Sequence, residues 1–129
     1  MVKYHSVSPR LPVTDLKRTM AWYVDHLGFE PGDVWPEGAP TFGLLGRDGV
    51  DVQFYVPPPN APEPSGHATL SFTVSNGHAV HQALVGKVPI EWGPEVYWYG
   101  RREFAVRDPN GYLVIFSEVT TDPPTCKDE

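Results

Sequence analysis

Apolar side chains recur at helical spacing over residues 16–27. They stand at Leu16 and then four, seven, eight and eleven positions later, which places them on one face of a helix. Thr14 or Asp15 offers an N-cap, and Gly28 is a typical C-terminal stop. The pattern therefore predicts an amphipathic helix over residues 16–27.

Alternating apolar and polar residues on both sides of this helix predict strands. The first strand is expected over residues 4–13, where Pro9 and Pro12 lack the backbone donor of a sheet ladder and indicate an irregular or edge strand. Asp48-Gly49 is a strong hairpin signal between two apolar segments. The later strands of this half are expected at residues 29–35, 41–46 and 50–56.

The same pattern returns after residues 57–66, which contain five prolines and are typical of an extended linker. Ser75-Asn76 can cap a second apolar stripe that ends at Gly86. The turn 108–111 separates two further apolar segments. The strands of this half are expected at residues 67–74, 88–92, 101–107 and 112–118.

The two halves are offset by a nearly constant distance. Asp15 and Asn76 are 61 residues apart, and the turn glycines Gly49 and Gly111 are 62 apart. This offset indicates an internal repeat of two βαβββ modules, and therefore an α+β fold within one domain over residues 1–129. The expected parts are module 1 at 4–56, the linker at 57–66, module 2 at 67–118 and a polar tail at 119–129.

Composition limits the classes of partner. The 129 residues carry 16 acidic and 10 basic side chains, a net charge of −6, and no basic block, which argues against nucleic-acid binding. The longest apolar run, Tyr112–Phe116, is too short to span a membrane. Cys126 is the single cysteine, which excludes an intramolecular disulfide. Because the N-terminus shows no signal-peptide pattern, we expect a soluble, cytoplasmic protein.

Four sequence motifs point to a family. They are residues 11–16 (LPVTDL), 21–23 (AWY), 27–29 (LGF) and 99–111 (YGRREFAVRDPNG). Together they resemble the glyoxalase/bleomycin-resistance/extradiol-dioxygenase (vicinal oxygen chelate) superfamily, most closely its metal-free bleomycin-resistance branch. The resemblance implies two modules whose curved mixed sheets enclose a cleft. In the bleomycin-resistance branch it also implies a domain-swapped homodimer with drug crevices at the interface.

The resemblance bears on metal binding, because metalloenzymes of this superfamily carry His, Gln or Glu on the first and last strands of each module. Those positions fall here on Ser8, Thr69, Ile115 and either Asp51 or Gln53. Two hydroxyls, one isoleucine and one polar side chain do not supply the three or four donors that a divalent ion needs. We therefore expect no metal and no other cofactor.

The histidines leave one alternative open. His5 and His67 are 62 residues apart, at the entries of the two first strands. A bulge in the proline-broken strand would let both face one side as a metal pair. His78 and His81 share a helix face without a nearby carboxylate, and His26 lies near a helix C-terminus. We interpret the last three as solvated.

Other catalytic arrangements find little support. The chain has no Gly-x-Ser-x-Gly motif and no glycine-rich loop that opens a helix. Glu103 and Glu118 could form a carboxylate pair, but we interpret them as strand-surface acids opposite Arg101, Arg102 or Arg107. We expect no catalytic residue.

Strand alternation separates core positions from ligand-facing ones. The apolar positions expected to pack under a helix are Val52, Phe54, Val56, Leu70 and Phe72. The alternate positions should line the concave side, where those of module 2 are polar and uncharged and suit a ligand with hydrogen-bonding groups. These ligand-facing positions are Asp51, Gln53, Tyr55, Thr69, Ser71 and Thr73.

Aromatic residues supply flat surfaces for a ligand. Trp35 precedes the first hairpin, Phe42 begins its first strand, and four of the eight residues over 92–99 are aromatic. Flat rings stack on planar ligand groups and attract cations over their faces. By the resemblance, Phe42 and the Trp98/Tyr99 pair match positions that clamp the planar rings of the drug.

Together these features predict a metal-free, dimeric binding protein, not an enzyme, that sequesters an aromatic, peptide-derived antibiotic such as a bleomycin-like compound and so gives resistance. Glu37, Glu95 and Asp51 would complement a cationic ligand. The alternative is a divalent-metal enzyme of the same superfamily (a lyase, thiol transferase or dioxygenase), and a third possibility is a protein-interaction domain. The predicted ligand-binding residues are Trp35, Phe42, Asp51, Gln53, Tyr55, Thr69, Ser71, Trp98 and Tyr99.

Overall fold

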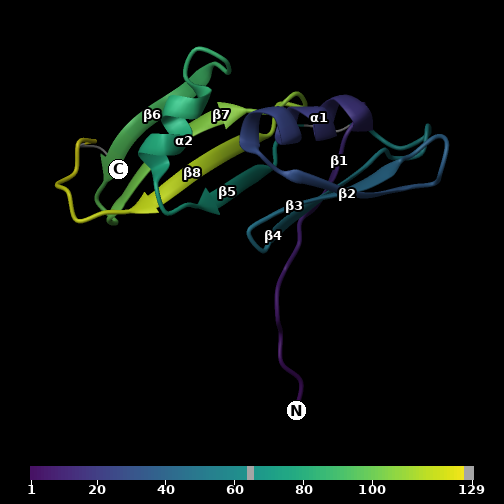
Figure 1. The fold of residues 1–129 in the computed structure, drawn as a ribbon, viewed down its shortest axis with the longest axis horizontal. Coiled ribbons are helices and arrows are strands. Elements are labelled where there is room, and N and C mark those ends of the chain that lie inside the picture. Colours follow the sequence, from purple (N-terminus) through teal and green to yellow (C-terminus); the bar gives the residue numbers. More distant parts are fainter. Residues whose placement is uncertain (64–65, 127–129) are drawn as a thin grey trace. The chain divides into compact units, whose positions relative to one another are not determined.

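A computed structural model of the chain describes residues 1–63 and 66–126. Contacts divide the chain into two units, unit 1 at Met1–Pro64 and unit 2 at Ser65–Glu129. Each unit consists of one helix and one four-stranded mixed sheet in the order β-α-β-β-β (Figure 1). The predicted α+β fold of two βαβββ modules is confirmed.

Unit 1 builds a sheet (sheet 1) with the strand order β1-β4-β3-β2. Strand β1 runs parallel to β4, and the other neighbouring pairs are antiparallel. The elements are β1 (Arg10–Pro12), α1 (Leu16–Leu27), β2 (Glu30–Trp35), β3 (Phe42–Arg47) and β4 (Val50–Tyr55).

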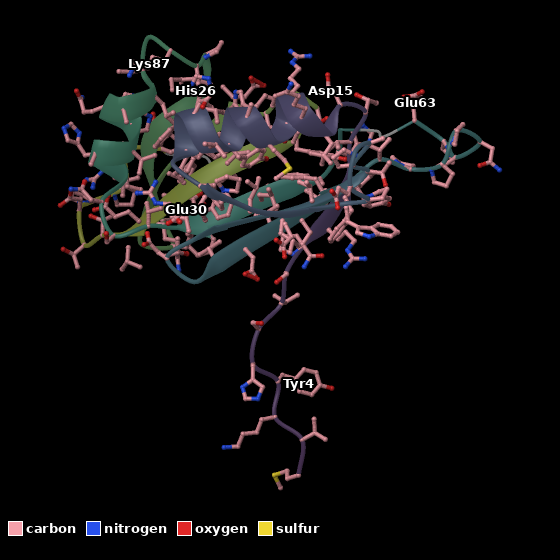
Figure 2. All side chains as sticks on the ribbon, turned by 45° about the vertical axis from the view of Figure 1, so that its right-hand side comes forward. Tyr4, Asp15, His26, Glu30, Glu63 and Lys87 are labelled. Atoms are coloured by element: carbon pink, nitrogen blue, oxygen red, sulfur yellow. The ribbon has the colours of Figure 1, made fainter. Side chains whose placement is uncertain are left out.

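Helix α1 begins and ends at the residues that the sequence indicates. The Asp15 side chain caps it by accepting from the Arg18 backbone N–H over 3.0 Å. Gly28 ends it in the left-handed conformation, with a φ of 70°. Figure 2 labels Asp15 at the start of this helix and His26 near its end. The buried Tyr23 ring packs 5.0 Å from the Phe54 ring of β4, which joins the helix to one face of sheet 1.

The β3–β4 hairpin turns at Asp48-Gly49, as predicted. Both residues have positive φ, 51° and 82°. Two such residues form the turn whose twist matches that of the flanking strands. Register then places Phe42 opposite Tyr55 and Leu44 opposite Gln53.

The first strand is much shorter than the predicted span of residues 4–13. Only Arg10–Pro12 forms β1, which is an edge strand as expected. The Pro9 carbonyl still accepts from the Gln53 N–H, but a proline has no N–H to extend the ladder. Residues 1–7 are exposed, and Tyr4 projects from a segment that leads away from the strands of unit 1 (Figure 2).

Unit 2 repeats the arrangement with a second sheet (sheet 2) in the strand order β5-β8-β7-β6. The Asn76 side chain caps α2 by accepting from the Ala79 N–H over 3.0 Å. The buried side chains of Phe104, Phe116 and Leu84 belong to its core. The elements are β5 (Thr69–Thr73), α2 (Gly77–Leu84), β6 (Ile90–Tyr97), β7 (Arg101–Arg107) and β8 (Leu113–Val119).

Strand β6 is longer than the predicted 88–92, and its register shifts on both sides of Trp92. Much of the aromatic-rich segment 92–99 is therefore strand, and only Trp98 and Tyr99 lie in the turn that follows. Gly93 allows the irregularity: its φ is 80°, and its backbone lies against β7.

The predicted polar tail is partly structured. Val119 is the last residue of β8, and the backbone N–H groups of Thr125 and Cys126 donate to the Val96 carbonyl of β6. The Thr125 hydroxyl also accepts from the Val96 N–H. The linker positions 64–65 and the tail positions 127–129 lie outside the described residues.

Among the described residues, no helix is both long enough and apolar enough to cross a membrane.

Replacing Gly93 with alanine should destabilise the protein far more than the same change at Gly86. Both glycines have positive φ, near 80° and 85°, so each alanine would cost about 1–2 kcal/mol of backbone strain. A Cβ at Gly93 would also collide with the Glu103 carbonyl oxygen and lie 2.9 Å from the Phe104 Cα, whereas Gly86 has nothing within 4 Å. Overpacking adds about 1–3 kcal/mol.

Urea unfolding of Gly93→Ala and Gly86→Ala measures this difference. Equal losses in the free energy of unfolding would contradict the close approach of β6 and β7 at Gly93.

Candidate ligand-binding site

The face of sheet 1 opposite α1, called here the open face of sheet 1, carries a line of aromatic side chains. Register aligns Trp35 of β2 with Phe42 of β3, and Phe42 with Tyr55 of β4. We name these three residues the aromatic row. Pro12 of β1 continues the row at the edge of the sheet.

Alternation with the residues that face α1 turns the aromatic row away from the core. Gly43 follows Phe42 and lies against Met20 of α1. Phe54 precedes Tyr55 and is fully buried. Trp35 is 69% exposed, whereas Phe42 and Tyr55 are half-buried, so the row offers aromatic surface that a molecule can reach.

A second row, next to the aromatic one, contains Arg10, Gln53 and Leu44. The Arg10 Nε–H donates to Gln53 Oε1 over 2.8 Å. Its guanidinium carbon lies 4.7 Å from the centroid of the Phe42 ring, within the range of a cation–π contact. Arg10 thus bridges the two rows.

Sequence reasoning missed Arg10. The signal was present, because Arg10 lies two residues after Ser8, and alternate residues of a strand share a face. The two prolines nearby made this strand appear too irregular for assigning faces.

A third row contains Asp51, Gly46 and Glu30. Ser8 joins it, because its hydroxyl donates to Asp51 Oδ2 over 2.5 Å. Ser8 therefore contacts Asp51, and Arg10 contacts Gln53. The structure brings all five predicted residues of module 1, Trp35, Phe42, Asp51, Gln53 and Tyr55, onto this one face.

The donor set of unit 1 does not fit a divalent metal ion. The oxygen of Gln53, one of the positions implied by the resemblance, accepts from a guanidinium whose positive charge opposes a second cation. The Ser8 hydroxyl is committed to Asp51. In unit 2 the matching positions are Thr69 and Ile115, and an isoleucine has no donor atom. Among the described residues, no group of three or more His, Cys, Asp or Glu could hold a metal ion.

The open face of sheet 2, opposite α2, mixes polar and apolar side chains, because register places Trp92, Ala105 and Ile115 in the same row as Ser71. Thr69 and Ser71 of β5 are exposed on it. The Arg101 Nη1 donates to the hydroxyls of Thr73 and Ser117, over 3.1 Å in each case. This face therefore offers hydrogen-bonding groups beside the half-buried ring of Trp92.

Tyr99 is held by two contacts in the turn between β6 and β7. Its hydroxyl donates to Glu103 Oε1 over 2.6 Å, and its ring stacks on Tyr97 at a centroid distance of 5.5 Å. Trp98, which is 69% exposed, meets the Tyr99 ring edge-on. The predicted residues of module 2 therefore form two groups, Thr69 with Ser71 on β5 and Trp98 with Tyr99 in the turn.

The environment of the Tyr99 hydroxyl raises its pKa to about 12. Desolvation is the largest cause, and the hydrogen bond to Glu103 and the charge of that carboxylate act in the same direction. Tyr99 as a whole is 46% exposed, but its hydroxyl points to a carboxylate that is only 9% exposed. The phenol is therefore a hydrogen-bond donor at neutral pH.

Glu103 is not the surface acid that the sequence suggested, whereas Glu118 is half-buried and lies opposite Arg102, as predicted for a strand-surface acid. Glu103 is buried and accepts from Tyr99. Glu118 Oε1 accepts from the Gly77 N–H at the start of α2 over 2.8 Å. Adjacent strand positions alternate in direction, so Glu103 belongs to the open face and Glu118 to the helix face. The two carboxylates do not form a catalytic pair.

The interpretation of His81 as solvated is wrong, because its half-buried ring packs edge-on against Phe104 at 5.1 Å. With His78 and Arg102 it lines a pocket of about 420 Å³ on the helix side of sheet 2. His26 is half-buried beside Trp22. His5 lies in the exposed segment of unit 1 and His67 in unit 2, so their pairing stays untested.

Solved structures with the same fold include proteins that bind antibiotics. The bleomycin-binding protein of Streptomyces verticillus, complexed with copper(II)-bleomycin, is 24% identical with a TM-score of 0.72, over 95% of this chain and 100% of that chain. TnmS3, an antibiotic-binding protein of Streptomyces sp. CB03234, is 20% identical with a TM-score of 0.76, over 93% and 99%. TioX of Micromonospora sp. ML1 is 21% identical with a TM-score of 0.76, over 90% and 99%.

No curated protein sequence matches the chain. A family model does match it over residues 4–116, which is most of its length. The two βαβββ modules and the sequence match agree, and the chain belongs to the Glyoxalase/Bleomycin resistance protein/Dioxygenase superfamily.

Proposed function

We propose that this protein binds a planar aromatic small molecule of the antibiotic class and sequesters it without making or breaking a bond. The aromatic row is the observation that carries the proposal. Trp35, Phe42 and Tyr55 align across three strands. The Trp35 side chain is exposed, and those of Phe42 and Tyr55 are half-buried. Stacking of a planar ligand on such rings is favourable by about 0.5–1.5 kcal/mol per ring pair beyond area burial.

Polar groups beside the row would orient the ligand. Gln53 and Asp51 lie in the next two rows of the same face. In unit 2, Thr69 and Ser71 offer exposed hydroxyls, and Trp98 and Tyr99 offer further aromatic surface. We propose each of these groups as ligand-binding within its own unit, with the aromatic row of unit 1 as the stacking surface.

Solved proteins of similar structure support this proposal. The bleomycin-binding protein and TnmS3 share the fold and bind antibiotics. We further propose that stoichiometric capture of the drug in the cytoplasm gives resistance to it.

A metal-dependent enzyme is the weaker candidate. Such an enzyme needs a set of converging donors, and in unit 1 the Gln53 oxygen is already bound to a guanidinium. Glu103 and Glu118, the candidate acid and base, lie on opposite faces of sheet 2. Sequestration needs neither a metal nor an acid–base pair.

A homodimer is also part of the proposal. Residues 1–7 contain four large apolar side chains, Met1, Val2, Tyr4 and Val7, each more than four-fifths exposed. Exposed apolar side chains gathered in one short segment are typical of an interaction surface. We propose that a second copy of the chain covers them.

A Trp35→Phe substitution should remove the part of the fluorescence response to a stacking drug that arises on the aromatic row. Bleomycin and planar bicyclic peptide antibiotics are the probes, and a ligand on the aromatic row would quench Trp35 in the wild-type protein. Phe42→Leu keeps apolar bulk but loses the ring, and should weaken binding about tenfold. Trp22→Phe, on α1, is the matched control and should leave the response intact.

Two results would contradict sequestration on the aromatic row. One is wild-type emission that no antibiotic of the panel changes at micromolar concentration. The other is a stoichiometric divalent metal ion in the purified protein.

Replacing Val2, Tyr4 and Val7 together with serine should weaken the dimer. The change removes the apolar area that the partner would bury, at about 25 cal/mol per Å², and the dimer dissociation constant should rise at least about tenfold. Sedimentation equilibrium measures it, and Lys3→Ser/His5→Ser is the control in the same segment. A wild-type protein that is monomeric at all concentrations, or a triple variant that dimerises as the wild type does, would refute the proposal.

The Tyr99–Glu103 contact predicts a specific alkaline transition. Because the pKa of Tyr99 is raised above 10 in the folded state, its stabilising effect is complete below pH 10 and is lost as the pH rises toward about 12. Tyrosinate absorbance of the wild type minus that of Tyr99→Phe should show a midpoint near pH 12. Glu103→Gln should lower this midpoint, and an unchanged midpoint would show that Glu103 does not act on Tyr99.

A further inference from the structure

The charge beside the aromatic row is positive, although the chain as a whole is negative. Arg10 bonds to Gln53 of β4 through Nε and lies over the Phe42 ring of β3. The hydrogen bond to Gln53 and the contact with the Phe42 ring together hold the guanidinium in one orientation. A fixed guanidinium loses little conformational freedom when a further group binds it.

The two Nη groups of Arg10 are left for a bound molecule. Within residues 1–63 and 66–126, the Arg10 side chain donates its hydrogen bond through Nε–H, to Gln53. Neither Nη1 nor Nη2 has an acceptor among these residues. These two groups carry four N–H donors in one plane. Such a fork matches the two oxygens of a carboxylate or sulfonate. Arg10 is exposed on an edge strand, so a ligand can reach it.

The acidic groups of this face lie farther from the row. Asp51 and Glu30 belong to the third row, and same-face rows are separated by two residues of strand, about 7 Å. Asp51 accepts from Ser8, and neither acid is paired with Arg10. A ligand that stacks on the aromatic row therefore meets Arg10 first.

We infer that the aromatic row selects planar ligands that carry an oxyanion, a carboxylate or sulfonate, at the edge of the ring, and that Arg10 recognises this group. The inference rests on the proposed function and names its ligand class. The net charge of −6 alone would favour a cationic ligand. Charge–charge interaction at contact distance outweighs that of dispersed surface charges, which salt screens beyond about 10 Å.

Three naphthalene compounds of matched ring size separate the charge classes. They are 2-naphthoate, 2-naphthamide and 2-naphthylmethylammonium, titrated into the full chain while the indole N–H signal of Trp35 is followed by NMR. Arg10 can pair with the charge of a carboxylate through two parallel N–H bonds, which a neutral amide does not match, so 2-naphthoate should bind about tenfold more tightly than 2-naphthamide. The ammonium compound should bind most weakly.

Variants of Arg10 test the assigned residue. Arg10→Met should bring the affinity for 2-naphthoate down to that for 2-naphthamide, while the affinity for 2-naphthamide changes less than about twofold. Arg10→Lys keeps the charge without the fork and should retain part of the preference. Arg18→Met, on α1, removes an equal charge from the opposite side of sheet 1 and should leave all three affinities unchanged.

The outcomes distinguish this inference from the proposed function. Equal affinity for the three probes, tighter binding of the ammonium compound, or an anion preference that survives in Arg10→Met would overturn the inference while stacking on the row stands. If no probe shifts the Trp35 signal, stacking on the row fails and the inference fails with it. Retained 2-naphthamide binding in Arg10→Met shows that this variant is folded.

Discussion

Each sheet is covered by one helix, and this asymmetry determines where a ligand can bind. A strand directs alternate side chains to opposite faces, so a helix on one face commits every second residue to the core and leaves the others outside it. In unit 1 the committed positions include Gly43 and Phe54, which lie against α1. Their neighbours Phe42 and Tyr55 are thereby placed on the open face. The position of the aromatic row follows from the position of the helix.

One contact on that face has two consequences. The bond from Arg10 to Gln53 occupies the amide oxygen with a positively charged donor, which disfavours a metal cation at the same place. The same bond, with the Phe42 ring beneath, holds the remaining donors of Arg10 toward a ligand. A single arginine on an edge strand therefore accounts for the misfit of a metal site and for the positive charge that the proposed ligand would meet.

Features with local causes could be predicted from the sequence, and features with distant causes could not. Asp15 and Asp48-Gly49 act on their immediate neighbours, so the helix and the hairpin were predicted within a residue or two. The extent of β6 depends on pairing with β7, and Glu103 is buried where it accepts from the Tyr99 hydroxyl of another element. Asp51, Gln53 and Tyr55 could be placed on one face by alternation, but the contact of Arg10 with a ring 32 positions away left no local pattern.

The internal repeat shows which positions packing constrains. The rows of the two sheets correspond through their registers, so that the row of Trp35, Phe42, Tyr55 and Pro12 in unit 1 matches that of Glu95, Glu103, Ser117 and Thr73 in unit 2. On the helix faces, Leu11 and Phe54 match Phe72 and Phe116, and all four are apolar. The helix faces are apolar in both units, whereas the matched open-face positions differ in chemistry, and two of those in unit 2, Glu103 and Ser117, are buried. The two modules therefore keep one backbone while the matched open-face positions carry rings in unit 1 and carboxylate and hydroxyl groups in unit 2.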